Sequence, residues 1–319
     1  MKAINNFLFA AGALLALTAC DDIIEQDISD DTVYIVSPLD GAEIESNVVP
    51  LQWSGLTGAD KYRVQIYSNQ AIVLDSTVTA THLTCPLSQG NYQWRVRGEN
   101  SAYVSAYSFT MSFHMMESED LENQQVLLSS PSANLYTKNH QLICTWDALD
   151  AADSYTFELV NITAGGIVVH QEPGITGTSF ELTEEYLTED AQYQWKVKAV
   201  NGTGSTNFST RMFYLDSTAP AASVNTVPLN NSVQISGTQV DFGWTVAPDS
   251  GTITSPVKYV VEVSNEVNFS SLLLASSMLS TNSYSNTFNT AGNYFWRVRT
   301  TDLAGNESVA SAVFKFTIN

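Results

Sequence analysis

Apolar and polar residues alternate with a period of two along three segments that share one pattern. The segments are Tyr92–Arg97, Tyr193–Lys198 and Tyr294–Arg299, and successive copies begin 101 residues apart. Each copy places Tyr, Trp and Val on one side, with Gln or Phe and two basic residues on the other. This alternation predicts a β-strand with one buried face. A constant period near one hundred residues predicts tandem domains, three in this chain.

Each repeat begins with a proline and turn residues, followed by an apolar strand that ends in tryptophan. The Pro–Trp pairs, 15, 15 and 16 residues apart, are Pro38 and Trp53, Pro131 and Trp146, and Pro228 and Trp244. A second alternating strand starts soon after, at Tyr62, Tyr155 and Tyr259. The pattern predicts an all-β chain of three tandem antiparallel β-sandwiches with seven strands each. Almost no helix is expected, except for a turn near Thr183–Glu189.

These residues resemble the fibronectin type III and related immunoglobulin-like sandwiches. The two Trp of each repeat resemble the tryptophans of strands B and F, and the Tyr two residues before the second Trp matches the tyrosine-corner position. Antibody domains carry a Cys where this chain has its second Trp, so the resemblance implies a core closed by aromatic packing. The segments Asp302–Ser308 and Val313–Ile318 resemble the F–G turn and last strand of many bacterial members. The resemblance covers residues 32–319 and implies a fold rather than a function.

The N-terminal residues have the pattern of an export signal. Lys2 precedes an apolar run from Phe7 to Leu17, which is shorter than the ~20 residues that a membrane-spanning helix needs. The residues Leu17-Thr-Ala19-Cys20 resemble the bacterial lipobox, and this resemblance implies cleavage before Cys20 and a diacylglycerol on its thiol. The alternative is an ordinary signal peptide with a chance cysteine. We expect membrane attachment through the lipid.

The predicted organisation has six parts. They are a signal peptide (1–19), a lipidated acidic tether (20–31), domain 1 (32–113), a linker (114–125), domain 2 (126–215) and domain 3 (216–319). The tether carries six acidic residues between Asp21 and Asp31 and is expected to be flexible. An acidic run after the lipidated Cys resembles the export signal of surface lipoproteins in Gram-negative anaerobes. We therefore expect a lipid-anchored outer-membrane protein exposed at the cell surface, with a periplasm-facing position as the alternative.

Net charge and side-chain chemistry limit the range of possible functions. The formal net charge of −20 makes nucleic acid an unfavourable partner. Cys85 and Cys144 lie in alternating apolar strands and are expected to be buried thiols. The four histidines are scattered, and the chain has no motif of a catalytic or metal site. We therefore expect no enzyme, no cofactor and no metal.

Six basic residues on the outer face of the repeated strand form the one candidate ligand surface. They are Arg95, Arg97, Lys196, Lys198, Arg297 and Arg299. One interpretation is a positive stripe that captures an anionic glycan. The other is pairing with neighbouring strands, for example with Glu158 and Glu262.

Three short motifs resemble the O-glycosylation acceptor of some anaerobic Gram-negative bacteria. Their acceptor residues are Thr32, Ser76 and Ser217.

Three functions remain open at this point. The first is a surface-anchored, non-catalytic binding, adhesion or spacer module with an unknown protein or glycan partner. The second is a glycan-binding lipoprotein of a polysaccharide-utilisation system. The third, an enzyme, ranks below both because no nucleophile has a partner at usable spacing.

Overall fold

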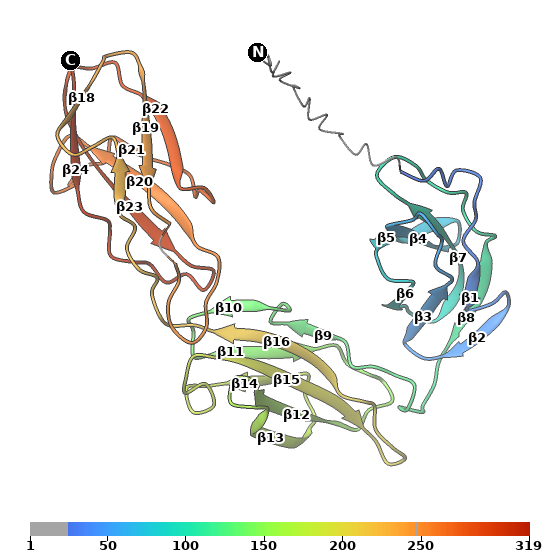
Figure 1. Ribbon diagram of the computed structural model, residues 1–319. Coiled ribbons are helices and arrows are strands. Elements are labelled where there is room, and N and C mark those ends of the chain that lie inside the picture. Colours follow the sequence, from blue (N-terminus) through green and yellow to red (C-terminus); the bar gives the residue numbers. More distant parts are fainter. Residues whose placement is uncertain (1–24, 247) are drawn as a thin grey trace, which may run out of the picture. The chain divides into compact units, whose positions relative to one another are not determined.

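The computed structural model describes residues 25–246 and 248–319, which form β-strands, turns and loops (Figure 1). No helix in the described part of the chain is long and apolar enough to cross a membrane. The strands form three pairs of sheets, each pair with one three-stranded and one five-stranded sheet. The predicted all-β fold of tandem antiparallel sandwiches is confirmed.

The first sandwich contains strands β1 to β8. Its three-stranded sheet has the order β1 (Ile35–Ser37), β3 (Val48–Trp53), β6 (His82–Pro86). Its five-stranded sheet has the order β2 (Ala42–Glu45), β8 (Met111–Met116), β7 (Gly90–Glu99), β4 (Lys61–Ser68), β5 (Ala71–Val78). The strand β5 pairs with β4 rather than with the three-stranded sheet.

The second sandwich repeats this order. Its three-stranded sheet is β14 (Ser179–Leu182), β11 (Leu142–Trp146), β9 (Leu128–Ser130). Its five-stranded sheet is β10 (Leu135–Thr137), β16 (Ser209–Leu215), β15 (Ala191–Val200), β12 (Ser154–Asn161), β13 (Ile167–Ile175). The segment near Thr183–Glu189 forms a turn closed by the Leu187 N–H and the Thr183 carbonyl.

The third sandwich has the same two sheets. The smaller is β17 (Asn225–Val227), β19 (Gln239–Trp244), β22 (Ser283–Thr287). The larger is β18 (Ser232–Gln234), β24 (Phe314–Ile318), β23 (Gly292–Thr301), β20 (Lys258–Ser264), β21 (Leu274–Ala275).

The expectation of seven strands per sandwich is wrong by one, because the first strand is split in two. The two pieces flank Pro38, Pro131 and Pro228 in the three sandwiches and join different sheets. Proline lacks the N–H that a continuous ladder requires, so the first piece ends there. The second piece then pairs with the last strand of its sandwich, in parallel for β10 with β16 and for β18 with β24.

The repeated strand is the centre of each core. Along β7, the side chains of Tyr92, Trp94 and Val96 are buried, and the intervening side chains face outward. The tyrosine corner predicted from the resemblance is confirmed. Tyr92, Tyr193 and Tyr294 each donate a hydroxyl hydrogen bond to the carbonyl four residues upstream, at 2.9, 3.0 and 2.8 Å. Each bond ties the start of the strand to the preceding turn.

Cys85 and Cys144, the two cysteines among the described residues, are buried and free, as predicted. Burial raises the pKa of the Cys85 thiol to about 11 and raises the pKa of Cys144 further still.

Neither thiol is expected to react with iodoacetamide at pH 8 while the chain is folded. The thiolate is the nucleophile, and its population at pH 8 is small when the pKa of Cys85 is about 11. Mass spectrometry should find both residues unmodified in buffer and fully alkylated in guanidinium chloride. Labelling of Cys144 in the folded chain would show that β11 does not face the core.

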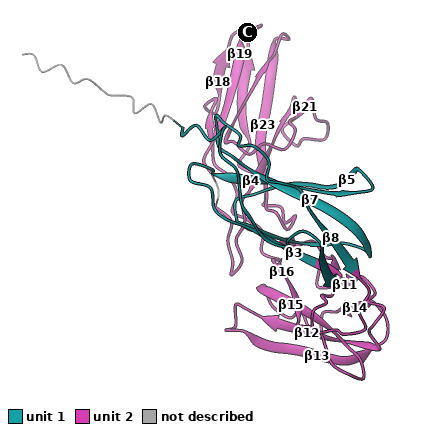
Figure 2. Cartoon of the chain, turned by 90° about the vertical axis from the view of Figure 1, so that its right-hand side faces the viewer, with its two compact units in different colours: residues 1–44, 49–115 teal, residues 45–48, 116–319 magenta. Residues whose placement is uncertain are grey.

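The chain divides into two compact units, residues 1–44 with 49–115 and residues 45–48 with 116–319 (Figure 2). The second unit contains the second and third sandwiches.

Two expectations about connecting segments need correction. The described part of the predicted flexible tether packs against the first sandwich, because Ile28 is fully buried and the Asp31 carbonyl accepts a hydrogen bond from Ala106. The predicted linker 114–125 begins inside β8. It also places Leu121, only 1% exposed, in the core of the second sandwich. In each of the two acidic segments, the burial of one apolar side chain contributes enough free energy to hold the backbone in place.

Candidate functional site

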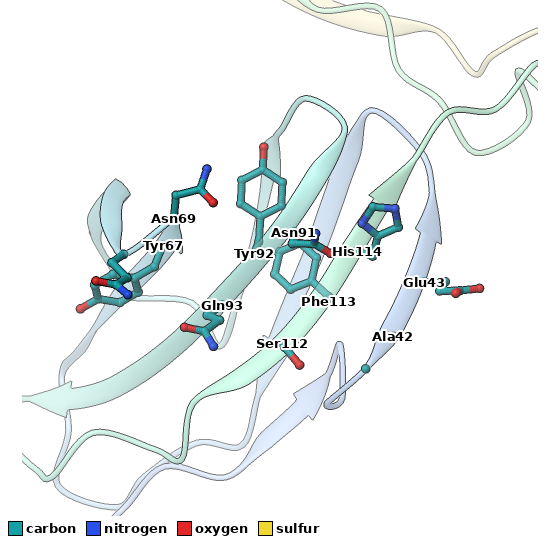
Figure 3. Close-up of a pocket in the computed structure, with 12 residues that line it drawn as sticks. Ala42, Glu43, Tyr67, Asn69, Asn91, Tyr92, Gln93, Ser112, Phe113 and His114 are labelled. Atoms are coloured by element: carbon teal, nitrogen blue, oxygen red, sulfur yellow. The ribbon is translucent and has the colours of Figure 1, made fainter.

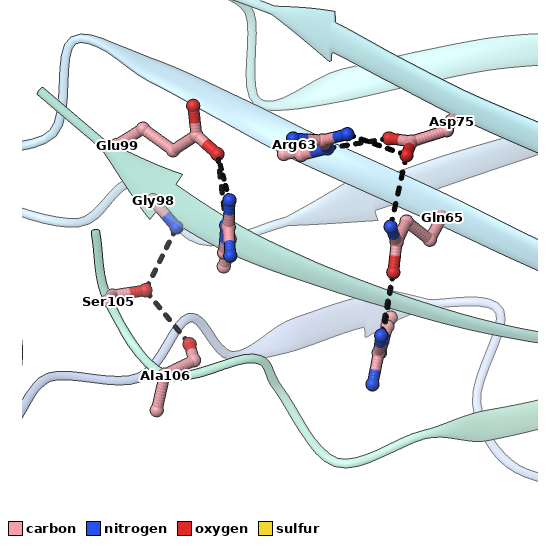
Figure 4. A network of polar contacts seen from close by, with 9 residues as sticks. Arg63, Gln65, Asp75, Gly98, Glu99, Ser105 and Ala106 are labelled. Atoms are coloured by element: carbon pink, nitrogen blue, oxygen red, sulfur yellow. Dashed lines mark hydrogen bonds and ion pairs between the residues drawn. The ribbon is translucent and has the colours of Figure 1, made fainter.

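In the first sandwich, the basic residues of the repeated strand belong to a polar network on the outer face of the larger sheet (Figure 4). Arg63 donates to both carboxylate oxygens of Asp75 at 2.7 Å, and these bonds lower the pKa of Asp75 to about 2. Gln65 bridges Asp75 to Arg95, whose guanidinium donates to Gln65 Oε1 at 2.8 and 3.0 Å. Arg97 pairs with Glu99 at 2.7 Å.

The corresponding cations of the other sandwiches are also engaged. Lys196 forms an ion pair with Glu158 across the sheet. Glu262 forms ion pairs with both Arg297, at 2.5 Å, and Arg299, at 3.1 Å. The predicted pairing with Glu158 and Glu262 is confirmed. The six basic residues therefore lie where the repeat places them, on three separate sheets, and each has a contact with a neighbouring side chain.

Aromatic rings complete these cation sites. Tyr107 lies beneath Arg95 and Arg97, with guanidinium carbons 4.0 and 4.8 Å from the ring centroid. Phe208 lies beneath Lys196 and Lys198 at 4.9 and 5.2 Å, and Phe269 lies beneath Arg297 at 4.1 Å. Such stacking fixes the cations further.

The segment that carries Tyr107 is held by serine hydroxyls. Ser105 Oγ accepts from the Gly98 N–H at 2.9 Å, and Ser108 Oγ accepts from the Val96 N–H at 3.0 Å. Ser308 and Ser311 repeat this pattern on Thr300 and Val298. The sequence signal for this contact is Ser-x-x-Ser after the repeated strand, as in Ser105–Ser108 and Ser308–Ser311.

A shallow depression of about 620 Å³ opens on the outer face of the first sandwich's larger sheet (Figure 3). It runs from β2 across β8 and β7 to the β4–β5 turn. Glu43, Asn69, Asn91 and Gln93 line it and make no side-chain hydrogen bond to another described residue. His114 Nδ1, also in its wall, is buried without a partner among the described residues. The depression therefore offers donors and acceptors that the fold does not use, and sequence reasoning did not find it.

A third polar feature lies where the chain enters the third sandwich. Carboxylate oxygens of Asp216, Asp249 and Asp302 all lie within 4.8 Å of one another. Asp216 is fully buried. Burial, together with repulsion from Asp249, Asp302 and Asp190, raises the pKa of Asp216 to about 6, although a hydrogen bond from the Thr218 N–H opposes the shift. The spacing of these three aspartates along the chain matches no common metal-binding motif, so a metal site here could not be expected from the sequence.

The remaining predicted sites are dispersed. Thr32 and Ser76 are half-buried, and Ser217 is exposed but donates its hydroxyl to Asp190 at 2.8 Å. Cys20 lies outside the described residues.

Comparison with known proteins yields structural likenesses only. No protein-family model matches the chain, and no curated protein matches it. The chicken CNTN1 FN1–FN3 domains align with 90% of this chain and 97% of their own, at 16% identity and a TM-score of 0.39. Fibronectin(III)-like modules of Clostridium thermocellum CbhA align with 61% of this chain and 94% of their own, at 16% identity and a TM-score of 0.40. Likenesses this weak support no inference, and the fold rests on the strand order of this chain.

Proposed function

We propose that the chain is a membrane-anchored extracytoplasmic lipoprotein that acts as a non-catalytic binding, adhesion or spacer module. Cys20, with its preceding apolar run, supports the lipid anchor. Three sandwiches in tandem suit a spacer that presents a binding surface away from the membrane. The acidic residues after Cys20 support a position on the cell-surface side of the outer membrane, with a periplasm-facing position as the alternative.

The observation that carries the binding role is the depression on the first sandwich. Polar side chains in a folded protein usually bond to the backbone, to each other or to water. Here one carboxylate and three amides from two strands and a turn line one surface, and their side chains have no hydrogen-bond partner among the described residues. An array of unused donors and acceptors on rigid strands is suited to recognising a polar ligand.

The composition of the depression favours a glycan as its ligand. Sugar hydroxyls are both donors and acceptors, which amide and carboxylate side chains match. Tyr67 lines the same depression and adds an aromatic ring. Arg95, whose guanidinium lies 5.3 Å from the Tyr67 ring centroid, adjoins it. This supports the second candidate, a glycan-binding lipoprotein of a polysaccharide-utilisation system.

The mature chain with Cys20→Ser should bind at least one member of a panel of neutral and anionic polysaccharides without cleaving it. Replacing Asn91 and Gln93 together by alanine should weaken binding roughly tenfold or more, because each lost hydrogen bond contributes ~0.5–1.5 kcal/mol. Isothermal titration calorimetry measures the affinity, and a reducing-sugar assay measures cleavage.

Gln52→Ala is the matched control, since Gln52 is an exposed amide on β3 in the opposite sheet of the same sandwich. It should leave the affinity unchanged. Undiminished binding by the double variant would exclude the depression as the binding surface. Failure of the whole panel to bind would contradict the glycan candidate, and turnover would contradict the non-catalytic role.

A further inference from the structure

In the first two sandwiches, one asparagine amide ties three segments together. Asn100, just after β7, donates from Nδ2 to the carbonyls of Gln26 at 2.9 Å and Gly58 at 2.8 Å. Asn201, just after β15, donates from Nδ2 to the carbonyls of Glu119 at 3.2 Å and Ala151 at 3.0 Å. Each amide therefore joins the turn after the repeated strand to the segment entering the sandwich and to the loop after the first tryptophan.

The third sandwich carries aspartate at all three corresponding positions. Asp302 follows Trp296 by six residues, as Asn100 follows Trp94 and Asn201 follows Trp195. Asp216 precedes Pro228 by twelve, as Gln26 precedes Pro38 and Glu119 precedes Pro131. Asp249 follows Trp244 by five, as Gly58 follows Trp53 and Ala151 follows Trp146.

This substitution removes the amide at that position, and Asn306 Nδ2 instead joins the turn to the entering segment by donating to the Asp216 carbonyl at 2.8 Å. An amide carries two N–H groups, whereas an ionised carboxylate only accepts. Asp302 instead accepts from the Asn306 backbone N–H and from Asn306 Nδ2, both at 2.8 Å. Asp249 accepts from the backbone N–H groups of Ser250 and Ser255. These bonds orient the carboxylates but contribute no positive charge.

Asp216 is the group in this cluster that most requires a ligand. Its side chain is fully buried, and its Oδ2 atom has no hydrogen-bond partner among the described residues. No lysine or arginine in the described part of the chain forms an ion pair with any of the three carboxylates. The nearby Lys138 ammonium donates to the Gly305 carbonyl at 2.7 Å instead. A buried, unpaired carboxylate beside two others is costly unless a cation joins them.

We propose that Asp216, Asp249 and Asp302 bind one calcium ion. All three donors are carboxylate oxygens, which suit a hard cation rather than zinc. Oxygens on opposite sides of Ca²⁺ lie ~4.6–5.2 Å apart, since each bond is ~2.3–2.6 Å long. All three oxygens lie within 4.8 Å of one another, so they can share that sphere. Mg²⁺ usually keeps several waters and binds one or two carboxylates, so three converging carboxylates favour Ca²⁺.

The ion joins the segment entering the third sandwich to two loops of that sandwich. Its role is therefore to stabilise this region, independently of any ligand bound by the first sandwich.

The test uses the mature chain with Cys20→Ser, stripped of metal with EDTA and titrated with CaCl₂ at pH 7.5. We expect one Ca²⁺ per chain by calorimetry, with a dissociation constant on the order of 10⁻⁴ M. Saturating Ca²⁺ should raise the midpoint of one unfolding transition by about 5 °C or more, because the ion binds only the folded state. Equal concentrations of MgCl₂ should give a markedly smaller shift.

Asp302→Asn and Asp216→Asn should each weaken calcium binding at least about tenfold and abolish the shift. Asp302→Asn restores the residue type of the first two sandwiches, so it should remain folded in EDTA. Asp241→Asn is the control, since Asp241 is an exposed acid on β19 outside the cluster. It should keep the full response.

Absence of stoichiometric binding, an undiminished response in Asp302→Asn, or an equal response to Mg²⁺ would overturn the proposal.

Discussion

Replacement of Trp195 by alanine is expected to lower the free energy of unfolding of the second sandwich by about 3–5 kcal/mol. The side chain is fully buried in β15 and belongs to the core that spans both sheets. Its ring lies 6.2 Å from the ring of Phe157, between centroids, and 6.0 Å from the Arg211 guanidinium carbon. Alanine would leave a cavity that the surrounding strands close only in part.

The expected loss comes from packing and from the stacking of Arg211 on the ring, and not from a hydrogen bond. Trp195 Nε1 has no hydrogen-bond partner among the described residues, so the substitution breaks no polar contact there. Differential scanning calorimetry of the full mature chain is the measurement, because three sandwiches unfold in more than one transition. The midpoint temperature of one unfolding transition should fall strongly, and the midpoints of the others should change little.

Ile143→Ala is the matched control for this variant. Ile143 lies on β11 of the same sandwich, and its side chain is 59% exposed. Its loss should stay within about 0.5 kcal/mol. A cost below about 1 kcal/mol for Trp195→Ala would show that the faces of β15 are reversed.

Replacement of Cys20 by serine is expected to abolish lipid attachment and membrane association. The proposed anchor is a diacylglycerol on the Cys20 thiol, and serine offers no thiol. Several acyl chains hold a protein stably in a membrane, whereas one chain holds it only marginally. Metabolic labelling with radioactive palmitate should therefore mark the natural chain and leave the variant unlabelled, and the variant should leave the membrane fraction.

Cys85→Ser is the control for lipidation, because Cys85 is a buried core residue. It should keep the label in whatever protein remains folded. Unchanged membrane partition of the Cys20→Ser variant would identify the Phe7–Leu17 stretch as the anchor instead. Labelling of intact cells with a membrane-impermeant biotin reagent then tests the side of the membrane. Modification only after lysis would favour the periplasm-facing alternative.

The sequence alone determined the fold class and the main core contacts. Alternation with a period of two and a 101-residue repeat depend on local chain geometry, which is the same wherever a strand lies. The tyrosine corner followed from the resemblance of Tyr92, two residues before Trp94, and its counterparts to that position in immunoglobulin-like sandwiches. The buried thiols and the pairing of Lys196 with Glu158 followed from the same alternation. The split of the first strand at Pro38 could not be predicted in this way. Which sheet each piece joins depends on which sheet edge is free to pair with it.

Only the tertiary structure decided which residues of the loops, turns and connecting segments meet. The acidic runs around Ile28 and Leu121 looked like flexible connections, since a single apolar residue gives no periodicity; its burial depends on a core formed by distant strands. The depression combines Glu43, Asn91 and Asn69 from separate strands and a turn, which sequence spacing does not bring together. In the sequence, the three aspartates of the cluster lie at fixed offsets from the repeated Trp and Pro positions. The meaning of the cluster appeared only when the structure showed that the three segments converge, because a metal site is defined by distances in space and not along the chain.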